Sequence, residues 1–147
     1  MLEFNDISYS EVSIIKELWE KNRKYHENIS EFFSDSYKGI EFESRIKGFE
    51  AFDGDSMKIT VARDDNRLIG YCISTALDGK GEVESIHVDE NVRGGGVGRQ
   101  LVERHLCWMR DKGCKIIGVT VSQENEPTIG FYRKLGFYPN TLYMQQK

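Results

Sequence analysis

A glycine-rich loop between a strand pattern and a helix pattern constrains this chain more than any other feature. Four of the five residues 94–98 are glycines, so no side chains cover the backbone amides there. Residues 82–88 alternate polar and apolar side chains, as a strand does. Apolar residues at helical spacing then run from Val97 to Met109. The loop therefore precedes a helix N-terminus, where unpaired N–H groups and the positive end of the helix dipole favour an anion such as phosphate.

The spacing of the glycines excludes two common phosphate motifs. The dinucleotide fingerprint G-x-G-x-x-G fails in both registers, because Arg99 or Leu101 stands where the third glycine belongs. The P-loop requires Gly-Lys-Ser/Thr, and Gly98 is followed by Arg99. The pattern that remains is Arg-x-x-Gly-x-Gly, formed by Arg93, Gly96 and Gly98. It resembles the pyrophosphate loop of the GNAT superfamily of acyl-CoA-dependent N-acetyltransferases.

A second motif, residues 125–137, resembles the other signature of that superfamily, Asn…Ala…Phe-Tyr-x-x-x-Gly-Phe. The segment here is Asn-Glu-Pro-Thr-Ile-Gly-Phe-Tyr-Arg-Lys-Leu-Gly-Phe, and it follows a predicted strand at 114–121. Two departures are small: Thr128 replaces a common Ala, and Gly95 replaces a residue that is often basic. With two motifs in the family's order, the chain is identified as a member of this superfamily.

The resemblance and the patterning together predict one N-acetyltransferase domain, residues 1–147, of α/β (α+β) class. We expect a mixed, mostly antiparallel sheet with helices on both faces and a V-shaped strand splay that holds acyl-CoA. Residues 1–57 would shape the acceptor site, and residues 58–147 would form the cofactor-binding core. The first half of the chain is expected to hold a strand at 2–7, a helix with a capping box of Ser8 and Glu11 that ends near His26, a short helix or loop within 27–41, and a short helix with Phe42, Ile46 and Phe49 that ends before Asp53. Three strands follow, at 58–63, 68–74 and 82–88, and then a helix at 97–112 closed by Gly113. The expected C-terminal part is a buried strand at 114–121, a helix begun by Pro127 and closed by Gly136, and a last strand pair at 137–144.

The cosubstrate that the resemblance implies is acetyl-CoA. Its pantetheine arm would lie along a strand edge like a short added strand, between two splaying strands at 82–88 and 115–121. The implied contacts are Ile86, His87 and Val88 by their backbone and Asn125 for the pantetheine, Arg93, Gly94, Gly95, Gly96, Val97, Gly98 and Arg99 for the pyrophosphate, Tyr132 near the thioester, and Lys134 for the adenosine end.

The reaction implied by the resemblance is attack of a neutral amine on the thioester, without a covalent enzyme intermediate. A lysine-like amine has a pKa near 10.4 and Glu near 4.3, so the base must be raised in pKa, work through water or act late. Glu84 and then Glu82 are the candidates, on one face of their strand. Each alone is also compatible with a solvent-facing carboxylate. Tyr132 matches the family's usual acid for the leaving thiolate, although a packing role is the alternative.

The cysteines and histidines suggest no metal site. Cys72, Cys107 and Cys114 lack CxxC spacing, which favours reduced thiols in a cytoplasmic protein. No base is placed beside Cys72 or Cys107, so we expect core thiols rather than acyl-carrying nucleophiles. The three histidines have no ligand-like spacing either.

Charge and composition bear on the partners. A net charge of −4 argues against nucleic acid, and the chain has neither a long apolar run nor a signal-peptide pattern, so no membrane is expected. Residues 1–56 carry a net charge of −6, and acids there alternate with aromatics. This pattern predicts a small cationic amine acceptor, such as a polyamine, an aminoglycoside or a lysine-like amine, unless the acids are only surface. The pocket would combine Trp19, Tyr25, Phe32, Phe33 and Tyr37 with Glu27, Glu31, Asp35, Glu41 and Glu43. A protein N-terminus or lysine is the alternative acceptor, a non-catalytic acyl-CoA sensor is the alternative of another class, and a homodimer is possible.

Overall fold

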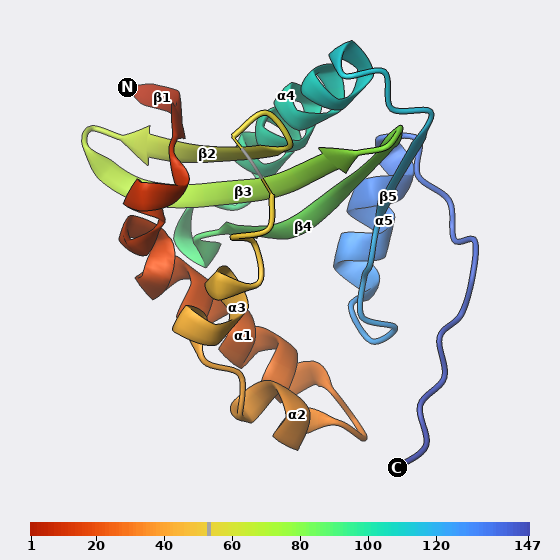
Figure 1. Ribbon diagram of the computed structural model, residues 1–147. Helices are drawn as coiled ribbons and strands as arrows, with labels where there is room; N and C mark the ends of the chain where they lie inside the picture. The colour runs from red at the N-terminus through yellow and green to blue at the C-terminus, as the bar shows by residue number, and fades with distance from the viewer. Residues whose placement is uncertain (53) are drawn as a thin grey trace.

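The computed structural model describes residues 1–52 and 54–147, and Asp53 lies outside the described residues. Five strands form one sheet in the order β1-β2-β3-β4-β5 (Figure 1). The first four pair antiparallel and β4 pairs parallel to β5, so the predicted mixed, mostly antiparallel sheet is confirmed. The strands are β1 (Leu2–Ile7), β2 (Met57–Asp64), β3 (Arg67–Leu77), β4 (Lys80–Val88) and β5 (Ile116–Val119).

Helices cover both faces of this sheet, as predicted (Figure 1). The capping box of Ser8 and Glu11 is present and opens a 3-10 turn that leads into the first helix, which extends beyond His26 to Ile29. The segment 27–41 holds one short helix. The helical elements are η1 (Tyr9–Ile15), α1 (Lys16–Ile29), α2 (Ser34–Lys38), α3 (Phe42–Lys47), η2 (Glu90–Val92), α4 (Val97–Asp111) and α5 (Glu126–Lys134).

The core has a layer on each side of the sheet. On one side α1 and α3 meet through Trp19 and Phe42, whose ring centroids lie 5.4 Å apart edge to face, over Tyr71 of β3. On the other side Leu101 and Met109 of α4 pack on β3 and β4. These two layers hold α1, α3 and the N-terminus of α4 around the C-terminal ends of β4 and β5.

Three sequence-based expectations are wrong. The buried strand predicted at 114–121 is the shorter β5, which lies at the edge of the sheet. Ile116 on β5 is 65% exposed, because among the described residues no strand pairs with the outer edge of β5. Residues 137–144 form no strand pair and run clear of the sheet (Figure 1). Cys107 is exposed rather than a core thiol, because α4 turns its opposite side to the sheet, whereas Cys72 is buried as expected.

A buried polar chain ties α4 to the sheet. The hydroxyl of Thr60 donates to Asp6 Oδ1 at 2.6 Å, so His105 Nε2, 2.9 Å from Thr60 Oγ1, must donate to that oxygen. His105 Nδ1 then accepts from Ser74 Oγ at 2.7 Å. Burial, reinforced by the charge of Lys58, lowers the pKa of His105 to about 3, so this imidazole is neutral.

The neutral, buried His105 in this hydrogen-bond network predicts that the protein loses stability in mild acid. Unfolded His takes up a proton below about pH 6.5, whereas folded His105 stays neutral to about pH 3. The stability contribution is thus complete above pH 6.5 and falls as the pH falls, by about 2 kcal/mol at pH 5. Urea unfolding at pH 7 and pH 5 should show this loss in the wild type and a smaller one in His105→Gln. Equal losses in both proteins would contradict the assignment.

Candidate functional site

The site begins where β4 and β5 part. Their parallel pairing ends at Val83 and Val119, and from there to Val88 β4 is paired only with β3. The predicted splay of two strands is therefore confirmed. Beyond Val83, the edge of β4 that faces β5 has no strand partner, so its backbone N–H and C=O groups face the gap.

A β-bulge in β4 lies just beyond this point. Ile73 pairs with Ser85 whereas Ser74 pairs with Val83, so Glu84 is the extra residue. Such a bulge bends its strand and redirects side chains. Glu84 and Ser85 consequently both bond to one face of β3: Thr75 Oγ1 donates to Glu84 Oε2 at 3.3 Å, and Ser85 Oγ lies 2.8 Å from the hydroxyl of Tyr71. Alternation from Glu82 already puts Glu84 on the side of the sheet covered by α1 and α3, and the bulge brings Ser85 to that same side.

A cavity of about 600 Å³ occupies the splay. Its wall joins the ends of β4 and β5, the glycine-rich loop with the start of α4, one side of α5, and the inner sides of α1, α2 and α3. A volume of this size suits a cofactor arm and a small acceptor together. The predicted site residues on its wall are Glu84, Ile86, His87, Val88, Arg93, Gly94, Gly96, Val97, Gly98, Arg99, Asn125 and Tyr132.

Side chains of α1 and α2 bridge to the loop that follows β5 and so close one side of the cavity. The hydroxyl of Tyr25 donates to Asn125 Oδ1 at 3.1 Å, and that of Tyr37 lies 3.2 Å from Ser122 Oγ. The ring of His26 stacks on Tyr37, with centroids 5.7 Å apart. Trp19, Tyr25 and Tyr37 therefore reach the cavity as the aromatic pattern predicts.

The glycine-rich loop presents a cationic, amide-lined end of the cavity. Gly94 and Gly96 have φ of 88° and 82°, which favours glycine, and Gly96 is the N-cap of α4. Gly98 faces Phe131 of α5, and a Cβ at this position would meet that ring at an ordinary contact distance of 3.6 Å. Arg93 donates to the carbonyl of Val88 at 3.0 Å. This end offers free helix amides and arginine, the partners that a pyrophosphate requires.

Glu84 has the environment of a proton acceptor. Its carboxylate is half-buried, and this burial, followed by the charge of Glu82, raises its pKa. The charge of Arg45 and the bond from Thr75 act in the opposite direction. A carboxyl with a raised pKa is closer to the pKa of an amine than an ordinary glutamate is.

Tyr132 has a buried hydroxyl without a hydrogen-bond partner among the described residues. Its ring is 3% exposed and contacts Phe131 and Phe137 edge to face, with centroids at 5.1 and 5.2 Å. Burial raises its pKa, so the phenol stays protonated. A buried donor without a partner is costly, and one on a cavity wall is typical of a group that bonds to a ligand. Together with the open edge of β4 and the amides of α4, this fits a thioester cofactor.

The structure leaves three predicted contact residues off the cavity wall. Glu82 lies before the splay opens, in the paired part of β4 opposite Thr75 and Gly118. Gly95 sits on the outer side of its loop and Lys134 at the C-terminal end of α5, and both are exposed.

The predicted acidic and aromatic acceptor pocket is wrong in most of its members. Phe32 and Phe33 do not line the cavity, nor do the acids, which are Glu27, Glu31, Asp35, Glu41 and Glu43. Among residues 1–52 and 54–147, Glu84 is the one carboxylate on the wall. The net charge of a segment does not determine which way its side chains point.

Sequence reasoning missed Arg45, Thr75 and Ser122. Arg45 lines the cavity from α3, and its guanidinium lies 4.5 Å over the ring of Phe49. Its spacing of four residues from Phe49 on a predicted helix was a usable signal. Thr75 and Ser122 do not line the cavity, but they bond to Glu84 and Tyr37, which do. Strand pairing and a loop bring them there, which no local pattern reveals.

Within the described part of the chain, no helix is long and apolar enough to span a bilayer. The same residues contain no group of three or more His, Cys, Asp or Glu side chains arranged to hold a metal ion.

Comparison with known proteins agrees with this geometry. The chain is 34% identical over 95 residues to mycothiol acetyltransferase of Thermobifida fusca (strain YX). The matched region covers 58% of this chain but only 29% of that protein. It is 30% identical over 92 residues to streptothricin acetyltransferase of Streptomyces lavendulae, covering 61% of this chain and 49% of that one. The fold matches a tetramutant of the BH1408 protein from Bacillus halodurans with a TM-score of 0.77 at 19% identity over 99% of both chains. The profile of the acetyltransferase (GNAT) family matches residues 15–137. The chain therefore belongs to the GNAT acetyltransferase family.

Proposed function

We propose that the chain is an acetyl-CoA-dependent N-acetyltransferase that acts on the primary amine of a small molecule. The observation that carries this proposal is the single cavity wall that combines the amide-lined loop, Glu84 and the unpartnered hydroxyl of Tyr132. The named relatives are acetyltransferases, and mycothiol and streptothricin are small molecules. Residues 1–147 would form one domain, with residues 1–57 on the acceptor side and 58–147 on the cofactor side.

The cofactor supplies an activated acetyl thioester. We place its pyrophosphate at residues 93–99, its pantetheine along Ile86, His87 and Val88 with Asn125, and its sulfur near Tyr132. The imidazole of His87 is neutral there, because burial, with the charge of Arg93, lowers its pKa to about 4. Gly95 and Lys134 would meet only parts of the cofactor that extend outside the cavity.

Direct attack needs one group to take a proton and one to give it. Glu84 accepts the proton that the amine loses, directly or through water, as the new C–N bond forms. Tyr132 donates to sulfur as the C–S bond breaks. No cysteine takes part: burial raises the pKa of Cys72 to about 12, and neither Cys107 nor Cys114 lies on the cavity wall.

A thioester-consumption screen over amines, amino acids and peptides tests the proposal. Turnover that depends on an added small amine would support it. Turnover only with peptides would favour a protein acceptor, and tight acetyl-CoA binding without turnover on any amine would favour a sensor module.

Removing the carboxylate of Glu84 should lower activity strongly. Glu84→Gln keeps the size of the side chain, and we expect kcat to fall by about 10²-fold or more, the usual contribution of a general base. Its raised pKa also predicts a rate that rises with pH above pH 4.5. Glu82→Gln is the matched control: Glu82 is off the wall, and its loss removes only a neighbouring charge that raises the pKa of Glu84, so kcat should fall much less. Equal losses in the two variants would show that Glu84 is not the base.

A further inference from the structure

We propose that the acceptor amine also carries a carboxylate, as an amino acid does, and that Arg45 binds that carboxylate. This inference rests on the proposed acetyltransferase function and specifies its substrate class. It replaces the cationic acceptor predicted from the charge of residues 1–56, because none of the acids at 1–52 and 54–56 lines the cavity.

Arg45 is placed to receive an anion. It is half-buried on the cavity wall, with its guanidinium held over Phe49 at 4.5 Å. One nitrogen, Nη2, lies 3.4 Å from the carbonyl oxygen of Glu84. No carboxylate of residues 1–52 and 54–147 lies within ion-pair distance of it. A stacked arginine with free donors is well suited to bind a carboxylate in a fixed orientation.

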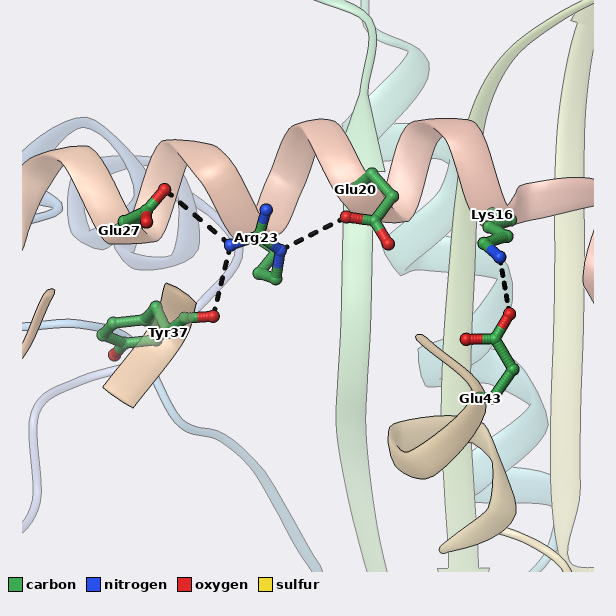
Figure 2. Close-up of polar contacts among 6 residues, drawn as sticks. All are labelled: Lys16, Glu20, Arg23, Glu27, Tyr37 and Glu43. Carbon is green, nitrogen blue, oxygen red and sulfur yellow. Dashed lines mark hydrogen bonds and ion pairs between the residues drawn. The ribbon is translucent and has the colours of Figure 1, made fainter. Parts of the chain in front are cut away.

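The neighbouring arginine of α1 is already neutralised. Figure 2 shows Arg23 between two glutamates of its own helix, with Nε 3.2 Å from Glu20 and Nη1 3.7 Å from Glu27. The same Nη1 also donates to the carbonyl of Tyr37 at 3.3 Å. On the acceptor side of the cavity, Arg45 is therefore the cation that has no carboxylate within ion-pair distance to balance its charge.

Opposite charges on one wall match a zwitterion. Glu84 faces the same cavity as Arg45, and Arg45 is close enough to lower the pKa of that carboxyl. An amino acid places an ammonium and a carboxylate two bonds apart on either side of one carbon. Its amine would approach Glu84 while its carboxylate meets Arg45. A second cationic group would instead be repelled by Arg45.

A single arginine also favours a carboxylate over a phosphate. Arg45 brings one positive charge. Of the other arginines on the wall, Arg23 and Arg99 are paired with glutamates, and Arg93 lies at the glycine-rich loop. The side chain of the acceptor would then contact Trp19, Tyr37 and Ile40, which line the same side. These contacts favour an apolar or aromatic amino acid.

The test compares each common amino acid with its carboxamide, alongside polyamines, in the thioester-consumption assay. We expect the best acceptors to carry the carboxylate. Arg45→Gln should raise KM for them by at least about tenfold and leave KM for the carboxamides nearly unchanged. Arg45→Lys keeps the charge but not the planar fork, so it should recover part of the loss.

Arg104→Gln is the matched control, because Arg104 also stacks on an aromatic ring, at 4.6 Å from Phe4, but lies outside the cavity. Preferred acceptors without an anionic group, or an Arg45→Gln loss equal for acids and carboxamides, would overturn the inference while leaving the acetyltransferase function intact. Absence of turnover on every amine would instead overturn the proposed function and this inference with it.

Discussion

Tyr132→Phe should lower kcat by at least about tenfold, since general acid catalysis usually contributes about 10²–10⁴-fold and water can replace part of it. The ring contacts to Phe131 and Phe137 survive the change, so acetyl-CoA affinity should stay nearly constant. Burial raises the pKa of the phenol, which alone would weaken it as an acid. A thiolate formed beside it in the same apolar surroundings is penalised in the same sense, so the gap between the two pKa values stays near the reference difference of about 1.5 units, and donation to sulfur costs only about 2 kcal/mol.

Stability separates this role from packing. The buried hydroxyl has no partner among the described residues, so its removal should leave the free energy of unfolding unchanged or raise it by about 1 kcal/mol. Tyr138→Phe, at a 75% exposed tyrosine, is the control for handling and expression. Single-turnover kinetics should report the loss. A wild-type rate under conditions where chemistry limits turnover would show that sulfur takes its proton elsewhere.

Gly96→Asp should weaken acetyl-CoA binding by at least about tenfold, since two like charges about 4 Å apart near a protein surface repel by up to about 4 kcal/mol. The new carboxylate would stand at the N-cap of α4, on the cavity wall and in the expected path of the pyrophosphate. A Cβ at this position meets no atom within 4 Å, so the structural cost is the strain of an Asp at positive φ, about 1–2 kcal/mol.

Calorimetry with acetyl-CoA measures this effect, and Gly79→Asp controls for backbone strain. Gly79 also has a positive φ, 78°, with free space for a Cβ, but lies in the turn between β3 and β4 away from the cavity. Unchanged affinity in Gly96→Asp, or an equal loss in both variants, would remove the phosphate assignment of the loop.

The two motifs brought most of their predicted contact residues to one cavity wall for a physical reason. A positive φ favours glycine, as at Gly94 and Gly96, and the first turn of a helix accepts proline, as in α5. Both preferences act on single residues, so they can be recognised in the local sequence. The elements that flank the glycine-rich loop, β4 and α4, were therefore placed correctly, and so was the splay of β4 from β5, whereas the strand pair predicted after the second motif is absent.

Features that depend on pairing or packing were not predictable in the same way. The bulge at Glu84 arises from the register between β3 and β4, which no single strand encodes. An apolar run such as β5 suits a central strand, yet it became an edge because residues 137–144 did not pair with it. Arg45 joins Glu84 only through the packing of α3 on the sheet, so the acceptor side could not be derived from composition.

The central claim is direct transfer of an acetyl group to an amine in the splay, and a quenched single turnover with isotope-labelled acetyl-CoA tests it most directly. The best acceptor of the screen should carry the label as an amide, and mass spectrometry should find none of it on the protein at any time point. Label on Cys72, Cys107 or Cys114 during turnover, or acetyl-CoA bound tightly with no label transferred to any amine, would contradict it.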